Sequence, residues 1–384
     1  MESESDVVVS GEVNCGGQEH FYLETNSCLA VPTEAGQLEI FASTQNANET
    51  QLAAAHACGI HASHVVCRIK RIGGGFGGKE TRALVFDTPV AVAAHNLGVP
   101  VRMNIDRDTD IQLSGQRHAF YGKYRAGCSS DGKLKFMDLE LYLNAGFSYD
   151  LSEPILGRAL FHADAAYKWP AFKVLGYMCK TNQTSHTAYR GFGGPQGIFV
   201  TETVIEHLAS ALQQFHRSSP QRPITSFDIR SSNLYASGEE THFGEVIEQY
   251  NVPDAWVQIA ETAEVERRQR EADEFNAANK WKKRTLCTLP TKYGINYTAK
   301  FMNQAGALIH VYRDGTVLIS HGGMEMGQGL HTKMCQVVAR ALNIPHEMVH
   351  VCETSTATVS NATATAGSMS TDMYGMVGLS DTPQ

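Results

Sequence analysis

The alternation of apolar and polar residues predicts β-strands in several parts of the chain. The stretch "VVCRIKRI" at 65–72 alternates apolar and charged residues, and "VPVRMNI" at 99–105 is predicted as a further strand. Alternating apolar residues also flank the Asp-Gly pairs at 131–132 and 314–315. Because Asp-Gly favours tight turns, we expect a β-hairpin at each of these two places.

Apolar residues that recur every three or four positions predict amphipathic helices. Such stripes follow the glycine-rich turn at 191–197, follow Pro253, and precede Pro345. The mostly apolar stretch 81–97 is also predicted to be helical, with Pro89 as a kink or an early break. The three stripes expected in the core are Val200, Val204, Leu208, Ala211 and Leu212; Trp256, Ile259, Ala260 and Ala263; and Met334, Val337, Val338, Ala341 and Leu342.

Polar stretches divide the chain into parts. The stretch "QQFHRSSPQRP" at 213–223 is polar and contains proline, so we expect a surface loop there. The charged run "EVERRQREADEF" is typical of a solvated helix face or a connector. Together the elements predict an α+β fold with a first domain at 1–240, a helical connector at 241–285, and a second domain at 286–384.

The composition is that of a globular protein, with 42% hydrophobic and 19% charged residues. No apolar run approaches the roughly 20 residues of a membrane helix, and "MESESDVVVS" does not resemble a secretory signal. A net charge of -8 without a basic stripe argues against nucleic acid as a partner. The nine cysteines include no C-x-x-C pair, which argues against a disulfide scaffold, a structural zinc site or an iron–sulfur cluster in this chain and favours a cytoplasmic setting.

The stretch "GGGFGGKE" at 73–80 comes close to two phosphate-binding patterns. A phosphate loop, G-x-x-x-x-G-K-[ST], would need a hydroxyl where this chain has Glu80. The glycines also fit a dinucleotide fingerprint, but the acidic residue expected about 20 positions further on is missing. A tight turn without a ligand and an anion site made of glycine amides both stay open. Glycine-rich turns recur at 191–194 and 322–329, which suggests that the backbone approaches one ligand from several sides.

Seven segments, in order along the chain, resemble the molybdopterin-binding portion of the xanthine dehydrogenase and aldehyde oxidase family. They are "GGQEHFYLET", "STQNANETQ", "KRIGGGFGGKETR", "GRALFHAD", "YRGFGGPQG", "NQAGALIHVY" and "HGGMEMGQGLHTKM". The resemblance covers most of residues 7–375. It implies two mixed α/β domains with the molybdenum cofactor in the cleft between them, the second domain being incomplete.

The resemblance also implies how a molybdenum-molybdopterin cofactor would be held. Gln45 would hydrogen-bond a ligand of the metal, the main chain at Phe76 and Arg190 would lie close to it, and Gly367 would lie beside it. No protein side chain coordinates molybdenum in this family, because the dithiolene of the cofactor does. The residues implied for the pterin and its phosphate are Gly77, Met326, Gly327, Gln328, Ser368 and Ser370.

For the substrate, the resemblance implies a purine. Glu80 and Arg158 would hydrogen-bond the purine, and Phe192 would stack on its face. Thr298 would contact its edge, next to Tyr297, where the family often has a second stacking phenylalanine. Aldehyde oxidases generally have apolar residues in place of the two charged ones, so Glu80 and Arg158 favour a purine over an aldehyde.

Each of these residues also has a plain structural interpretation. Glu80, near Lys79 and Arg82, could form an ion pair at the surface. Arg158 could form a salt bridge between domains, Phe192 could belong to the core, and Gln45 could cap a turn.

The resemblance implies a hydroxylase that converts hypoxanthine and xanthine to urate with water as the oxygen source. Electrons would leave through [2Fe-2S] clusters and FAD, expected only in N-terminal domains that this chain lacks. The family's general base, a glutamate in a Gly-Glu-Pro-Pro-like stretch, is expected beyond residue 384, so we assign no catalytic residue and expect no activity of the chain alone. Full-length members are homodimers. The alternatives are an aldehyde oxidase-like hydroxylase and a non-catalytic truncated protein or pseudoenzyme that binds a cofactor or a partner.

Overall fold

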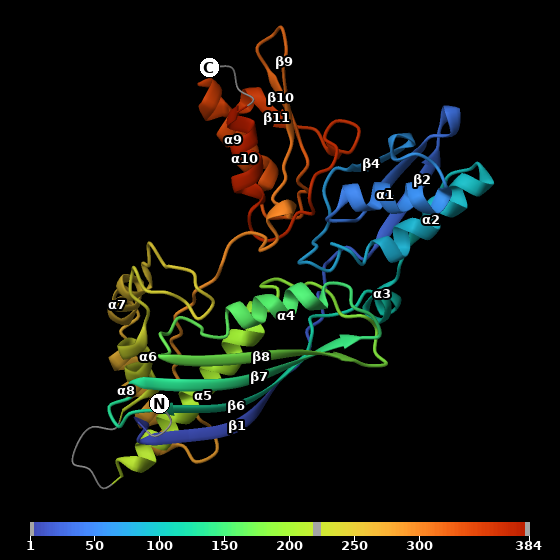
Figure 1. Ribbon diagram of the computed structural model, residues 1–384. Helices are drawn as coiled ribbons and strands as arrows, with labels where there is room; N and C mark the ends of the chain where they lie inside the picture. The colour runs from blue at the N-terminus through green and yellow to red at the C-terminus, as the bar shows by residue number, and fades with distance from the viewer. Residues whose placement is uncertain (1–3, 218–223, 381–384) are drawn as a thin grey trace.

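The computed structural model describes residues 4–217 and 224–380, which form three β-sheets with associated helices (Figure 1). The first sheet has the strand order β1-β6-β7-β8, in which β7 pairs antiparallel with β6 and parallel with β8. Its strands and main helices are β1 (Val7–Cys15), β6 (Phe120–Cys128), β7 (Leu134–Gly146), β8 (Ala171–Lys180), α4 (Ser152–Phe161) and α5 (Gly194–Phe215).

Strand alternation explains the core of this sheet. Leu139, Leu141 and Leu143 of β7 are fully buried on one face, whereas the residues between them are only half-buried. The apolar stripe of α5 joins the same core. Since α4 lies between β7 and β8 in the chain, it makes the crossover that a parallel pair requires.

The second sheet combines residues from distant parts of the chain. Its order is β12-β4-β3-β2-β5, and β12 pairs antiparallel with β4. Its elements are β2 (Ser27–Pro32), β3 (Leu38–Ala42), β4 (Val65–Ile69), β5 (Val101–Asn104), β12 (Thr354–Ser355) and the helices α1 (Ala47–Cys58) and α2 (Leu84–Leu97). The segment that contains β12 is therefore anchored on the N-terminal part of the chain.

The third sheet has the order β11-β10-β9 and lies in the C-terminal part, drawn in orange and red in Figure 1. Its elements are β9 (Ala307–Val311), β10 (Val317–His321), β11 (Val349–Val351), α9 (Leu330–Leu342) and α10 (Ser370–Ser380). The remaining helices are α3 (Arg107–Leu113), α6 (Ser226–Asn233), α7 (Val252–Thr262), α8 (Val265–Ala278) and the short 3-10 turns Glu34–Gly36, Ala62–His64, Lys300–Met302 and His346–Met348.

Most predicted elements are present. Both Asp-Gly hairpins form, and the fold class, a mixture of helices and mixed sheets, is confirmed. The loop prediction at 213–223 is wrong at its start, because α5 continues to Phe215; residues 218–223 lie outside the described residues. The stripe predicted after Pro253 is core only at Trp256, since Ile259 is 45% exposed. None of the helices in the described ranges combines the length and the apolar character needed to cross a bilayer.

Candidate cofactor and substrate site

The glycine turn at 75–78 has a backbone conformation that few sequences tolerate. Phe76 and Gly77 have φ values of 54° and 102°, and the amide of Gly78 donates to the carbonyl oxygen of Gly75 over 2.9 Å. Two successive positive φ values closed by such a bond are the pattern of a type I′ turn. Left-handed backbone is costly for phenylalanine, so surrounding structure must hold Phe76 in place.

Gln45 supplies part of that support. Its Oε1 accepts hydrogen bonds from the amides of Gly77 (2.9 Å) and Lys79 (3.3 Å), and its Nε2 donates to the carbonyl oxygen of Thr365 (3.0 Å). The side chain is buried and lies between the end of β3 and the start of α1. The interpretation that Gln45 caps a turn is therefore confirmed, and the same side chain also reaches the C-terminal part of the chain.

The tetrapeptide "GFGG" recurs at 191–194 with the same conformation at its two central residues, although Gly191 has a positive φ of 91° and Gly75 does not. Phe192 and Gly193 have φ values of 49° and 95°, and the turn closes with the same 2.9 Å hydrogen bond. The amide of Arg190 donates to the carbonyl oxygen of Phe76 over 2.8 Å. The two turns, far apart in the sequence, therefore lie side by side.

Helix α4 supports the second turn. Phe192 is half-buried and packs against the apolar core of the first sheet, here called the first core, as its structural interpretation expected. The main chain of Gly193 lies so close to Ile155 and Ala159 of α4 that a Cβ there would clash with the Ile155 carbonyl oxygen. Because Arg158 lies on the same helix, the turn and Arg158 are positioned together.

Arg158 reaches the segment 293–297, which follows the helical connector. Its guanidinium donates to the carbonyl oxygens of Gly294 (2.8 Å) and Asn296 (2.5 Å), and it lies 5.6 Å from the centre of the Tyr293 ring. The Tyr293 hydroxyl donates to the carbonyl oxygen at the start of the second turn (3.1 Å). The partners of Arg158 are thus main-chain carbonyls, and the interpretation as a salt bridge between domains is wrong.

Glu80 is buried near the same segment, with 5% of its surface exposed. Burial, and then the neighbouring carboxylate of Asp150, raise its pKa to about 7. Burial, and then the charge of Glu80, raise the pKa of Tyr297, which indicates an electrostatic interaction between Glu80 and this segment. The interpretation of Glu80 as a surface partner of Lys79 is wrong, because both side chains are buried and Lys79 contacts other groups.

A loop at 324–329 reaches the site from the C-terminal part of the chain. The Glu325 carboxylate accepts hydrogen bonds from the amides of Gly327 (2.9 Å), Gly329 (3.0 Å) and His331 (3.0 Å). The carbonyl oxygen of Glu325 accepts from the amide of Ile72 (2.9 Å), just before the first glycine loop. The loop is therefore fixed both internally and against the N-terminal part.

The predicted cofactor residues in this loop are accessible. Met326 is half-buried, and Gly327 and Gln328 are exposed. The Gln328 side chain accepts from the amide of Met326 (2.8 Å) and donates to the Met324 carbonyl oxygen (3.0 Å). Gly327 has a φ of 103° and open space where a Cβ would be, so the backbone there can be approached closely.

The stretch 365–370 completes the convergence. The carbonyl oxygen of Gly367 accepts from the amide of Asn296 over 3.2 Å, which joins this stretch to the segment that Arg158 contacts. Ser368 is exposed and has a φ of 58°, another left-handed position without glycine. Ser370 is buried at the start of α10.

Tyr297 and Thr298 are the other two residues predicted to contact the substrate. The Tyr297 hydroxyl donates to the Ala364 carbonyl oxygen (2.7 Å), and Thr298 beside it is exposed.

A hollow of about 400 Å³ lies over β1, β6 and β7, and one of about 580 Å³ lies beside α10. Neither hollow is lined by a predicted site residue, so the candidate site is defined by the hydrogen bonds between its segments.

The sequence analysis missed two ion pairs next to the site. Lys79, fully buried, lies 3.5 Å from the carboxylate of Glu24, and Lys292 lies 2.8 Å from the fully buried carboxylate of Asp164. The paired residues are 55 and 128 positions apart. No local pattern of apolar and polar residues could reveal pairs at such separations.

Two family models match the chain. Both are described as a molybdopterin cofactor-binding domain, and they match residues 1–215 and 258–377. The chain belongs to the molybdopterin cofactor-binding domain family. Both "GFGG" turns lie in the first match, whereas the 324–329 loop and the stretch 365–370 lie in the second, so the family covers all these segments.

Relatives of this family member are similar over nearly its whole length. "Xanthine dehydrogenase/oxidase" of Felis catus is 48% identical over 374 residues, or 97% of the chain, and "Xanthine dehydrogenase 1" of Arabidopsis thaliana is 47% identical over 371 residues, or 96%. The chain spans about a quarter of these relatives, 27% and 26% of their lengths. The resemblance inferred from the seven segments is confirmed, as is molybdopterin as the family's cofactor.

Solved structures share the fold. CO dehydrogenase from Oligotropha carboxidovorans matches 98% of the chain and 48% of its own, with a TM-score of 0.82 and 20% identity. The aldehyde oxidoreductase from Desulfovibrio gigas matches 98% of the chain and 40% of its own, with a TM-score of 0.79 and 21% identity. At such low identity these matches concern the fold alone.

Proposed function

We propose that the chain forms the cofactor- and substrate-binding region of a purine hydroxylase. The observation that carries the proposal is the convergence of the two "GFGG" turns, joined by the hydrogen bond from Arg190 to Phe76, with the segment 293–297, which includes Tyr297 and contacts Arg158. This convergence supports a single site to which Glu80 and Arg158, the two residues that favour a purine, would both contribute.

The residues at this convergence suit a pterin cofactor. Phe76, Phe192 and Ser368 all have left-handed backbone, and strained positions of this kind cluster at ligand sites. Gln45, Gly77, the 326–328 backbone, Ser368 and Ser370 would hold the cofactor, with Phe76, Arg190 and Gly367 beside the metal. When bound, the cofactor supplies the metal centre for oxygen transfer from water. Among the described residues, the Gln45 Nε2 has one acceptor, Thr365, so its second N–H is available to a ligand.

The substrate side of the site combines an aromatic face with polar groups. Glu80 is buried with a pKa of about 7, so near neutral pH its carboxyl can either donate to or accept from a heterocycle. The guanidinium of Arg158 has five N–H groups and retains donors beyond those directed at Gly294 and Asn296. Phe192 and Tyr297 offer aromatic surface. A planar ring with donors and acceptors at its edge matches this set better than an aldehyde does.

Binding measurements test the proposal directly. The 384-residue chain is loaded with molybdopterin, its pterin content is measured by fluorescence, and it is titrated with xanthine and with an aromatic aldehyde. We expect xanthine to bind more tightly, and Glu80→Val to weaken xanthine binding by about tenfold or more. Glu153→Val, at an exposed carboxylate of α4, is the matched control. Equal affinities for both ligands, or no effect of Glu80→Val in a folded, loaded chain, would contradict the purine assignment.

A non-catalytic binding role is the second candidate. The engagement of Arg158 by main-chain carbonyls favours it, because this arginine already has a structural task. The resemblance places the general base and the electron-transfer groups outside these 384 residues, so we propose that the chain alone forms no urate. Urate production by the purified chain would refute this part of the proposal.

The setting and partners belong to the same proposal. All nine cysteines are free, which supports a reducing, cytoplasmic compartment. The partner we propose is a small purine, with no nucleic acid or membrane involved. Assembly of full-length members into homodimers stays a prediction from the resemblance.

A further inference from the structure

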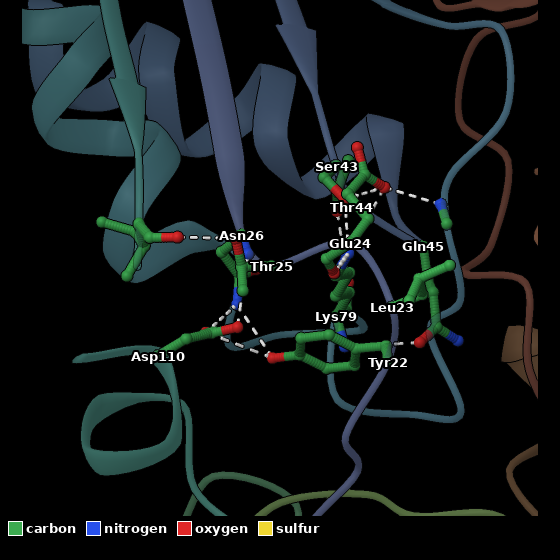
Figure 2. A network of polar contacts seen from close by, with 12 residues as sticks. Tyr22, Leu23, Glu24, Thr25, Asn26, Ser43, Thr44, Gln45, Lys79 and Asp110 are labelled. Carbon is green, nitrogen blue, oxygen red and sulfur yellow. Dashed lines mark hydrogen bonds and ion pairs between the residues drawn. The ribbon is translucent and has the colours of Figure 1, made fainter. Parts of the chain in front are cut away.

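The buried ammonium of Lys79 is held at the base of the first glycine loop. Its Nζ donates to the Glu24 carbonyl oxygen (2.7 Å) and to the Ser43 hydroxyl (2.6 Å), and it lies 3.5 Å from the Glu24 carboxylate. The ring of Tyr22 lies beneath it, with its centre 4.4 Å away. Figure 2 shows Lys79 among these residues, below the segment that carries Gln45. The Lys79 side chain is fully buried.

Glu24 connects the other end of the same loop. Its Oε2 accepts from the amide of Gly73 (2.6 Å) and from the Ser43 hydroxyl (2.9 Å), and its own amide donates to the Gly73 carbonyl oxygen (3.1 Å). One carboxylate therefore contacts the first residue of the loop and faces the ammonium at its last residue. The Lys79–Glu24 pair therefore links the two ends of the loop 73–79.

The backbone of Lys79 is bonded to the segment that carries Gln45. The carbonyl oxygen of Lys79 accepts from the amide of Gln45 (2.8 Å) and from the Thr44 hydroxyl (3.3 Å), and the amide of Lys79 donates to the Gln45 side chain (3.3 Å). Glu80 is the next residue. Any rotation of the chain at Lys79 would therefore move both Gln45 and Glu80.

The free-energy cost of burying the Lys79 ammonium suggests that it does more than stabilise the fold. Removing an ammonium from water is expensive, and burial lowers the pKa of Lys79 to about 8. An apolar side chain could fill the same space without this penalty. Buried ionic groups that are retained despite such a cost are candidates for fixing one conformation among several.

We infer that Lys79 and Glu24 form a positioning pair, which fixes the orientation of Gln45 toward the cofactor and of Glu80 toward the substrate. In this proposal both side chains act through the backbone of residues 73–80. The inference rests on the proposed function for what Gln45 and Glu80 contact, but not for how the loop is held.

Hydrogen exchange tests the positioning without any ligand. In Lys79→Met, the amides of residues 77 and 79, which donate to Gln45, should exchange about tenfold faster, because the link between the two ends of the loop is lost. Amides of the distant strand β7 should be unchanged. The matched control is Arg68→Met. Arg68 lies in β4 of the same sheet, and the substitution removes its ion pairs with Glu39 and Glu353. It should leave the exchange of the two amides unaffected.

Glu24→Gln keeps the experiment decisive if Lys79→Met does not fold. It removes the charge but keeps an oxygen that can accept from Gly73, and it should accelerate the same amides by a smaller factor. In the double variant the two effects should be less than additive, since the residues act as one unit. Unchanged exchange at both amides in a folded variant would overturn the inference.

Xanthine affinity of the cofactor-loaded chain gives the second readout. Lys79→Met should lower it by about tenfold, whereas Arg68→Met should leave it within about twofold of the unsubstituted chain. Faster exchange with unchanged affinity would overturn the role toward the substrate. If the unsubstituted chain binds no xanthine, the proposed function fails, and the exchange rates alone decide whether the pair holds the loop.

Discussion

The two "GFGG" turns have one sequence and the same conformation at their two central residues, but different supports. In each, a phenylalanine and a glycine take positive φ values, and the same 2.9 Å hydrogen bond closes the turn. The turn at 75–78 is supported by polar side chains, namely Gln45 and the Lys79–Glu24 pair, and its Gly77 also lies against the main chain of Ala188. The turn at 191–194 lies on the main chain of α4 and on the apolar first core.

The difference shows that a local sequence can specify the shape of a turn while the tertiary structure decides what the turn responds to. A turn held by hydrogen bonds and charges is sensitive to the loss of a polar partner. A turn pressed against helix backbone is sensitive to added volume, because packed interiors yield little. The variants below separate these two sensitivities.

Gly193→Ala should have the largest effect. The new Cβ would clash with the Ile155 carbonyl oxygen at a φ of 95°, and main chain cannot move aside as a flexible side chain can. We expect a loss of about 4 kcal/mol in the free energy of unfolding, measured by urea denaturation. Gly238→Ala is the control: it has a similar φ of 87° but open space around it, and should cost only about 1 kcal/mol. Equal costs would show that strain, not packing, dominates.

Gln45→Leu should weaken the first turn. It leaves the amides of Gly77 and Lys79 and the carbonyl of Thr365 without this partner in a buried place. The expected cost is about 3 kcal/mol, since each buried polar group left unpaired costs roughly 1–3 kcal/mol unless it relaxes. Gln51→Leu, at a buried glutamine that donates to two carbonyls in the same sheet region, should cost less. A cost of Gln45→Leu below that of Gln51→Leu would contradict the assigned support.

The charge next to the first turn gives a pH test. Since the pKa of Glu80 is raised from 4.5 to about 7, its neutral form stabilises the fold fully below about pH 4.5, and this contribution is lost as the pH rises through about 7. Glu80→Gln should remove that loss, with a difference on the order of 3 kcal/mol between pH 5 and pH 8. Glu153→Gln, at an exposed carboxylate, should keep the pH dependence of the unsubstituted chain. The measurement is urea unfolding at both pH values.

The contrast between the two turns also shows which features of the site could be predicted from the sequence. The glycine turns were predictable because repeated glycines mark backbone that needs positive φ. Burial of Lys79 was not, because in the window "GGKETR" a lysine between polar residues is typical of a surface. Its partner Glu24 lies 55 positions away, and nothing local links the two residues.

The partners of Arg158 were equally hidden from the sequence. The resemblance pointed to the side chain itself, but its acceptors are the carbonyl oxygens of Gly294 and Asn296. Every residue has a carbonyl, so composition carries no signal for such a contact. Only the fold, which brings the segment 293–297 against Arg158 of α4, determines which carbonyls are used.

Asparagine at the two phenylalanines should give the smallest effects and the sharpest contrast. Asparagine tolerates left-handed backbone better than phenylalanine, so both substitutions relieve strain of roughly 1 kcal/mol. Phe76 is 42% exposed and loses little packing, whereas Phe192 packs against the first core. We therefore expect Phe76→Asn to leave the free energy of unfolding within about 0.5 kcal/mol or to raise it, and Phe192→Asn to lower it by about 1–2 kcal/mol. If both variants changed stability equally, the turns would share one kind of support, and the distinction between a polar and an apolar base would fail.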